Sequence, residues 1–305
     1  METRAGDPGA FAHFDLTSVP SPAFVVDEAA VRRNLAILAD VRDRSGIKLL
    51  SALKAFSMWS LGGVVGEYLD GVCASGLYEA RLGREEYKGE VATYCAGYKA
   101  EDVPEICALS DHVIFNSPGQ HERFRPILED ARKQGARFDI GLRINPLHAE
   151  GEVAKYDPCQ PHSRLGFPVD QLRTEMLDGV DGLHFHSLCE QDFEPLKRTW
   201  AALEPRIAPF LPRLKWLNLG GGHHITRADY QRDELVAFLR DILFGNQVRD
   251  FERRFARLEE RLIKETTTLK DDMRKRLDAL EAYIRSEAES LESQIKSERN
   301  DRTDA

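Results

Sequence analysis

Short runs rich in apolar and β-branched residues alternate with amphipathic stretches between Pro22 and about Ile242. In the stretch 28–42, apolar residues recur at three- and four-residue steps, which predicts a helix; they are Val31, Leu35, Leu38 and Val41. The runs between such stretches are predicted strands, at residues 23–27, 48–54, 71–75, 91–95, 112–116, 140–145, 182–187 and 216–220. Strands separated by helices predict a parallel sheet, and eight of them favour an α/β (TIM-type) barrel.

The hydrophobic period changes near the end of the sequence. From Val248 onward, apolar or small residues recur about every 3.6 positions, between the 3.5 of a heptad and the 3.67 of an eleven-residue repeat. This predicts one long amphipathic helix that pairs with a copy of itself or with another helix, as in a coiled coil. A solvated helix that docks on its own domain is the alternative. Gly245 and Asn246 predict a break before this helix, so we expect an extension at 1–20, a barrel at 21–244 and a helical tail at 245–305.

Composition narrows the class of protein. The 305 residues are 42% hydrophobic and 30% charged, as expected for a soluble globular protein. The net charge of −9 argues against a nucleic-acid partner, and no window reaches the roughly 18 apolar residues that span a bilayer. Residues 1–7 lack the apolar core of a signal peptide, and five scattered cysteines favour a reducing compartment. We therefore expect a cytoplasmic protein without membrane contact.

Polar residues end many of the predicted strands: Lys54, Ser75, Asn116, Asn145 and Ser187. In a barrel the carboxyl ends of the strands meet at one mouth, where chemistry is found. Capping of the following helix is the simpler explanation for Ser75 and Asn116. Lys54 either extends to solvent or lies in a pocket, where desolvation would favour a Schiff-base nucleophile.

Two histidines, His184 and His186, alternate along one predicted strand and therefore share a face. Together with His223 or His224 they could hold a metal, as in barrel hydrolases. Alternatively, one of them could lie against a planar cofactor while the other packs.

Gly220, Gly221 and Gly222 follow the last strand, where backbone N–H groups can approach a phosphate. A lysine, a ring-stacking histidine and a glycine cradle at strand ends are what pyridoxal 5'-phosphate (PLP) requires.

Seven motifs resemble the carboxynorspermidine (carboxyspermidine) decarboxylases, which are similar to ornithine and diaminopimelate decarboxylases. They cover residues 52–56, 80–86, 141–146, 156–159, 163–166, 183–191 and 220–228. The resemblance runs from about Ser21 to Ile242. It implies an alanine-racemase-type barrel that binds PLP, and decarboxylation of a small polyamine precursor in spermidine or norspermidine biosynthesis.

The resemblance also implies roles for single residues. Lys54 would bind the cofactor, His186 would stack on its ring, and the three glycines would hold its phosphate. Four further residues lie in motifs near the site without a defined role: Arg143, Arg164, Cys189 and Glu190. Residues 23–27 would leave the barrel to pair with a C-terminal β-domain, which leaves seven barrel strands. We expect a homodimer through the barrel, the helix or both.

The sequence departs from the family after Leu239. It contains no Glu-Pro-Gly motif, and the helical tail occupies the place of the last barrel strand and the β-domain. By resemblance, the missing glutamate keeps the pyridine nitrogen of PLP protonated. We therefore expect impaired decarboxylation. The alternatives are an inactive barrel fused to a self-associating helix and, third, the metal-dependent hydrolase.

Overall fold

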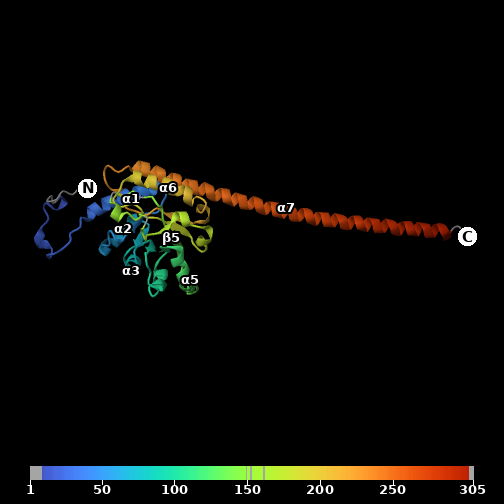
Figure 1. Ribbon diagram of the computed structural model, residues 1–305, viewed down its shortest axis with the longest axis horizontal. Helices are drawn as coiled ribbons and strands as arrows, with labels where there is room; N and C mark the ends of the chain where they lie inside the picture. Colours follow the sequence, from blue (N-terminus) through green and yellow to red (C-terminus); the bar gives the residue numbers. More distant parts are fainter. Residues whose placement is uncertain (1–8, 149, 152, 161, 302–305) are drawn as a thin grey trace. The chain divides into compact units, whose positions relative to one another are not determined.

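The chain divides into two compact units, residues 1–246 and residues 247–305. The computed structural model describes residues 9–148, 150–151, 153–160 and 162–301, and Figure 1 colours them in chain order. The first unit holds the sheet and its helices. The second consists of the larger part of one helix, α7 (Arg232–Asp301), which begins in the first unit.

The first unit is built on a parallel sheet whose strands follow the order β1-β2-β3-β4-β5-β7-β8, with β6 paired to β5. The strands are β1 (Leu50–Ala52), β2 (Gly71–Ala74), β3 (Glu90–Tyr94), β4 (His112–Phe115), β5 (Asp139–Asn145), β6 (Phe167–Pro168), β7 (Gly182–His184) and β8 (Trp216–Asn218). Seven of them coincide with predicted runs, which confirms the alternation of strands and helices. Since all pairs are parallel, the carboxyl ends of the strands lie at one edge.

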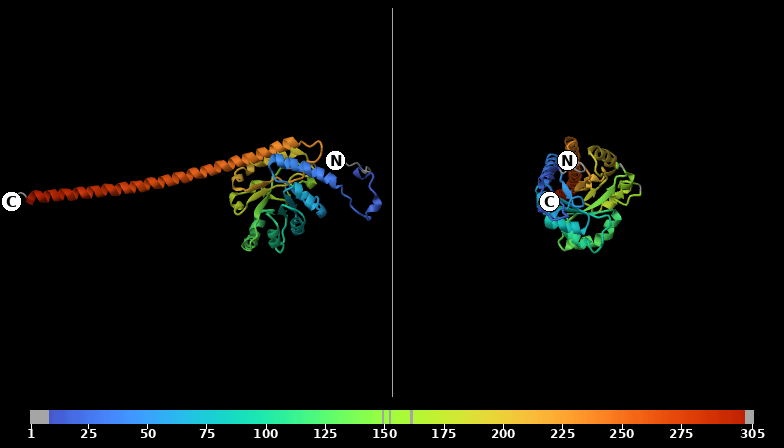
Figure 2. Two further views of the ribbon diagram at one scale, coloured as in Figure 1. Left: turned by 180° about the vertical axis from the view of Figure 1, so that it is seen from behind. Right: turned by 90° about the vertical axis from the view of Figure 1, so that its left-hand side faces the viewer.

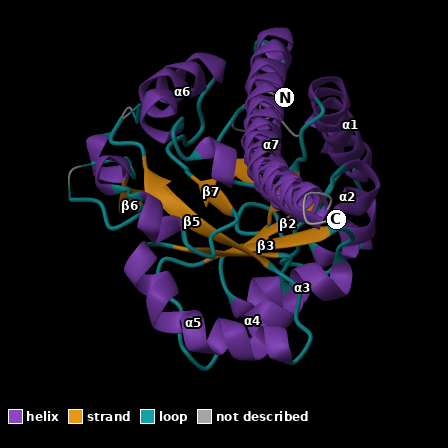
Figure 3. Cartoon of the chain, turned by 90° about the vertical axis from the view of Figure 1, so that its right-hand side faces the viewer, coloured by secondary structure: helices purple, strands orange, loops and turns teal. Residues whose placement is uncertain are grey.

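Helices lie around the outside of this sheet (Figures 2 and 3). They are α1 (Glu28–Ser45), α2 (Gly62–Tyr68), α3 (Leu77–Glu86), α4 (Val103–Leu109), α5 (Pro118–Lys133) and α6 (Phe193–Ile207). The helix predicted at 28–42 is confirmed as α1. Its ends follow from local chemistry: the Asp27 side chain accepts the Ala30 N–H at 3.1 Å, and Gly46 adopts a left-handed φ of 77° that ends the helix.

Inside the sheet, the Trp216 indole of β8 fills the space left by two glycines on neighbouring strands. A Cβ on Gly182 would lie 2.1 Å from the Trp216 ring, and one on Gly141 would lie 2.4 Å from it. His112 of β4 meets the same indole edge-on, with ring centroids 5.1 Å apart. These glycines therefore serve packing, because any larger side chain would displace the indole.

The sheet is an open half-barrel. Within the described residues, β1 and β8 each pair with a strand on one side only. The seven strands of the main path are the seven that the sequence assigns to the barrel, while the two-residue strand β6 on β5 was not predicted.

Two details of the sequence prediction are wrong. Residues 23–27 form no strand, because none of the described strands pairs with this run, and Phe24 is fully exposed. The two compact units do divide directly after Asn246, as expected, but the helix is not interrupted there, because α7 continues through Gly245 and Asn246. One glycine inside a helix costs only about 1 kcal/mol, too little to end a long helix. The long helix itself is confirmed.

No helix in the described ranges combines the length and the apolar character needed to cross a membrane.

Candidate functional site

The residues singled out by sequence meet where the strands end. Lys54 lies two residues after the end of β1, His186 two residues after β7, and Gly220–Gly222 begin two residues after β8. The side chain of Lys54 is exposed, and no hydrogen bond or ion pair engages its ammonium group within the described chain. It nevertheless lies close enough to His186 that its charge lowers the pKa of the imidazole.

His186 is held as a neutral ring at this edge. Burial lowers its pKa to about 4, with further contributions from the positive charges of Lys54 and Arg143. The backbone N–H of Gly221 donates to Nδ1 at 3.1 Å, so this nitrogen carries no proton. At neutral pH, His186 is therefore a flat, uncharged ring whose Nδ1 is held as an acceptor at this edge of the sheet.

The glycine segment packs closely against the loop after β7. Gly220 has a φ of 74°, and a Cβ there would lie 2.4 Å from the Phe185 carbonyl oxygen. Gly222 has a φ of 93°, and its Cβ would lie 2.2 Å from the Leu188 carbonyl oxygen. Both positions therefore require glycine. At Gly221, by contrast, the space around a Cβ is open.

Two of the three glycine amides are already engaged. The Gly220 N–H donates to Asn218 Oδ1 at 2.8 Å, and the Gly221 N–H donates to His186. The Gly222 N–H meets no acceptor in the part of the chain that the structure describes. The open space at Gly221 and this amide are the features suited to an anion.

His184 is the packed member of the histidine pair. Its ring lies nearly parallel to that of His186, with centroids 6.5 Å apart, so the two share a face as predicted. The Nδ1–H donates to Asn218 Oδ1 at 3.0 Å. Burial, with the charge of Arg143 and the neighbouring His186, lowers the pKa of His184 to about 3.

The metal-site alternative does not hold for the residues described. No three histidine, cysteine, aspartate or glutamate side chains among them come together to hold an ion. The physical reason is that each imidazole has a different partner: His184 bonds Asn218, His186 bonds Gly221, and His223 Nδ1 bonds the Tyr230 hydroxyl at 3.2 Å. The side chain of His224 adds no ligand to such a group.

Arg143 of β5 lies at the centre of the edge. Its side chain is buried, its guanidinium lies 4.8 Å from the centre of the Tyr94 ring, and Nη2 donates to the His186 carbonyl oxygen at 3.0 Å. Arg143 thus holds the backbone that carries His186. The Arg164 side chain is exposed, and this residue contributes its carbonyl oxygen, which accepts from Asn116 Nδ2 at 2.8 Å.

Cys189 and Glu190 are exposed in the loop after β7, and Glu190 has a left-handed φ of 53°. This loop is tied to the glycine segment, since the Gln191 N–H donates to the Gly222 carbonyl at 2.9 Å and the His224 N–H donates to the Gln191 carbonyl at 3.1 Å. The two loops that carry His186 and the glycines therefore form one connected wall.

Sequence reasoning missed Tyr94 and Asn218. The Tyr94 hydroxyl donates to Asn116 Oδ1 at 2.7 Å, while its ring stands between Arg143 and His184. Asn218 joins His184 to Gly220 through one oxygen. Each is a polar residue inside a predicted run, one or two positions before its end, so the signal that found Lys54 at the end of its run did not single them out.

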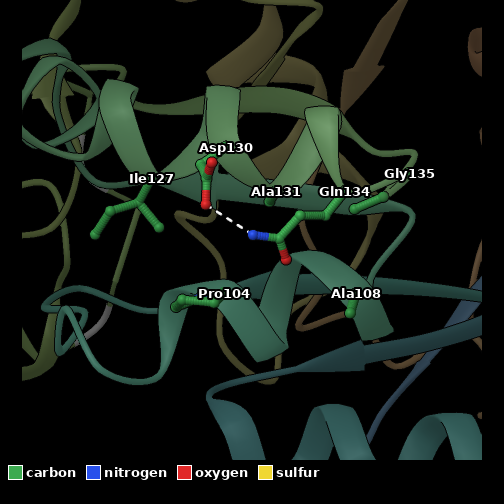
Figure 4. Close-up of a pocket in the computed structure, with 8 residues that line it drawn as sticks. Pro104, Ala108, Ile127, Asp130, Ala131, Gln134 and Gly135 are labelled. Carbon is green, nitrogen blue, oxygen red and sulfur yellow. Dashed lines mark hydrogen bonds between the residues drawn. The ribbon is translucent and has the colours of Figure 1, made fainter.

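A hollow elsewhere in the first unit lies between α4 and α5 (Figure 4). Its lining includes Pro104, Ile127 and Asp130, and the Gln134 amide donates to Asp130 Oδ2 at 2.8 Å. It contains none of the residues at the strand ends, so the candidate site is distinct from it.

No protein-family model matches the chain. The chain is 34% identical over 232 residues to the carboxynorspermidine/carboxyspermidine decarboxylase of Campylobacter jejuni, covering 75% of this chain and 59% of that protein. It is 37% identical over 224 residues to the carboxyaminopropylagmatine decarboxylase of Synechocystis, covering 73% and 57%. The crystal structure of the Campylobacter jejuni carboxynorspermidine decarboxylase complexed with norspermidine superposes with a TM-score of 0.67 at 33% identity, over 75% of this chain and 58% of that one.

The barrel is related to these decarboxylases. The resemblance carried by the seven motifs is thereby confirmed. Diaminopimelate decarboxylase from Helicobacter pylori, at 18% identity and a TM-score of 0.55, shares the fold. The chain spans about three fifths of the length of the first two curated relatives.

Proposed function

We propose that the first unit binds PLP at the carboxyl ends of β1, β7 and β8, and that it serves decarboxylation of a carboxylated polyamine. The observation that carries this proposal is the place of Lys54, His186 and the three glycines just after the carboxyl ends of β1, β7 and β8 in one parallel sheet. The relatives named above are decarboxylases, and one of them is solved with norspermidine. A polyamine that carries a carboxylate is therefore the substrate class we assign.

The residues present fit this cofactor. Lys54 supplies an amine without a competing anion, His186 supplies a flat ring, and Gly221 has open space beside it. The buried hydroxyl of Ser187, next to His186, has no hydrogen-bond partner within the described residues and could donate to a bound group. The Gly222 amide could do the same for a phosphate.

Each residue would have a separate task. Lys54 would hold the cofactor aldehyde, His186 would cover one face of the ring, and Arg143 would fix the backbone of His186. When bound, PLP supplies a ring that accepts the electron pair left by departing CO₂. The ring accepts that electron pair most readily when its nitrogen is protonated.

We further propose that this chain decarboxylates slowly. By resemblance, the glutamate that protonates the ring nitrogen belongs to a Glu-Pro-Gly motif, which the sequence does not contain. Among the described residues no strand joins β1 to β8, so no eighth strand closes the barrel.

Absorbance spectroscopy with added PLP tests the cofactor proposal. We expect a new band near the visible edge in the wild type and its loss in Lys54→Ala. Lys48→Ala is the matched control, because Lys48 precedes the same strand and pairs with Glu90. A band of equal strength in all three proteins would contradict the proposal. Release of CO₂ from carboxyspermidine then tests the activity.

Self-association through residues 247–305 is a second proposed function. It is supported by a row of apolar side chains on α7 that are more than half exposed, including Leu258, Leu269 and Leu280. We place the protein in the cytoplasm, in agreement with its five free cysteines. Sedimentation of the whole chain tests self-association, and a monomer at high concentration would contradict it.

A further inference from the structure

The exposed apolar row on α7 follows an eleven-residue period. Leucine recurs at this spacing four times, at Leu258, Leu269, Leu280 and Leu291. Two companion series keep the same spacing on either side: Phe255, Thr266, Leu277 and Ala288, and Leu262, Met273, Ile284 and Ile295. The steps within the row are therefore three, four and four residues, repeated from Phe255 to Ile295.

This period restricts what can cover the row. Eleven residues in three turns give 3.67 residues per turn, which favours a nearly straight or slightly right-handed pairing. A heptad partner turns by about 5° more per residue, which accumulates to roughly half a turn over forty residues. A partner helix with a heptad period would therefore lose contact with the apolar row before the last residues of the row. A second copy of the same helix has the same period throughout.

Charges beside the row favour a parallel copy in register. On the two flanks of the row lie Lys270 and Glu281 on one side and Glu265 and Arg276 on the other. In a parallel pair each flank meets the opposite flank of the partner, so that Glu265 faces Lys270 and Arg276 faces Glu281. Both contacts are attractive.

An antiparallel pair centred on the same row is less favourable. Each flank would then meet its own copy, so that Arg276 would face Arg276 and Glu265 would face Glu287. The contact between Lys270 and Glu281 would be attractive, but the like charges outnumber it.

Thr266, the most polar member of the row, does not prevent this pairing. Its hydroxyl donates to the Leu262 carbonyl oxygen at 2.7 Å within the helix. It therefore needs no partner across the interface, and burying it costs little.

We propose that residues 255–291 form a parallel, in-register pairing with a second copy of this chain along the eleven-residue row. The proposal rests on the proposed self-association and specifies its surface, its orientation and its partner. It differs from a heptad coiled coil in the residues that are buried: heptad steps from Leu262 would reach Arg276 and Tyr283, whereas the eleven-residue row runs through Leu277 and Ile284.

Matched substitutions in the full chain test the surface. Leu269 and Ile263 are exposed to nearly the same extent, at 63% and 66%. The positions eleven and twenty-two residues after Ile263 are arginines, Arg274 and Arg285, which places Ile263 outside the row. We expect Leu269→Glu to weaken association more than about 100-fold in sedimentation equilibrium, and Ile263→Glu to change it less than about twofold.

Charge exchange tests the orientation. Arg276→Glu and Glu281→Arg, each alone, should weaken the dimer about tenfold at low salt, while the double variant should return it to within about threefold of the wild type. Residues 276 and 281 are five apart, so they form no pair within one helix.

The outcomes separate the two proposals. A wild-type monomer would overturn self-association altogether. A dimer that Leu269→Glu leaves intact would overturn the proposed surface while self-association stands. A dimer that Leu269→Glu dissociates, but that the double charge variant does not restore, would overturn the parallel register.

Discussion

The sheet of the first unit and the helix of the second unit use leucine in opposite ways. Leu183 of β7 is completely buried, whereas Leu280 of α7 is 58% exposed. In the sheet, the apolar pattern is satisfied within the chain and brings Lys54, His186 and the glycines to one edge. In the helix, an equally regular pattern leaves its described leucine side chains more than half exposed. A regular apolar pattern therefore reports a packing surface, and only the structure shows whether the chain itself covers it.

Truncation of these two leucines should give the largest difference between the two units. Leu183→Ala should lower the free energy of unfolding of the first unit by about 2–5 kcal/mol, because it opens a cavity in a packed core. Leu280→Ala should change the same transition by less than about 0.5 kcal/mol. Chemical denaturation followed by tryptophan fluorescence measures both, and equal costs would contradict the contrast between the two units.

Acid should destabilise the first unit through its buried histidines. The pKa values of His184, His186 and His223 are lowered to about 3, 4 and 4, mainly by burial, from about 6.5 in the unfolded chain. The unfolded state therefore binds more protons below pH 6.5, and stability rises with pH up to that value. Between pH 7 and pH 5 each histidine should cost about 1–2 kcal/mol.

Denaturation at several pH values measures this slope. His186→Gln should reduce it, whereas the exposed His13→Gln should leave it unchanged. A slope unaffected by His186→Gln would show that this ring is not held neutral by burial.

Asn218 offers a smaller test. Asn218→Ala removes the acceptor shared by His184 and Gly220, and we expect it to cost about 1–2 kcal/mol and to weaken PLP binding. On α7, the Thr267 hydroxyl donates to the Ile263 carbonyl oxygen at 2.8 Å, yet it is exposed, so Thr267→Ala should cost less than about 0.5 kcal/mol. Titration with PLP and thermal unfolding measure the two effects; equal losses would argue that Asn218 does not organise the edge.

Much of the fold could be predicted because it is encoded locally. Seven strands and α1 follow from hydrophobic period, and the position of Lys54 follows from the end of a run. The run at 23–27 has the same local pattern, but no strand in the described ranges pairs with it, and pairing is not a local property. The continuity of α7 through Gly245 depends on the strong helix on both sides.

The candidate site was predictable only in part. Residue type and resemblance indicated Lys54, His186 and the glycines, but not that two glycine amides bond Asn218 and His186. The positions of Tyr94 and Arg143 around His184 depend on the order of β3, β5 and β7 in the sheet. Such contacts join residues about 40 to 90 positions apart, which no sequence window contains.

Chemical trapping of the cofactor tests most directly whether Lys54 is the residue that binds PLP. Borohydride reduction of the PLP-loaded protein, followed by peptide mass spectrometry, identifies the lysine that holds the cofactor. If PLP is bound at Lys54, we expect one modified peptide, which contains Lys54, and no such modification in Lys54→Ala. Modification of another lysine, or of many lysines equally, would contradict it.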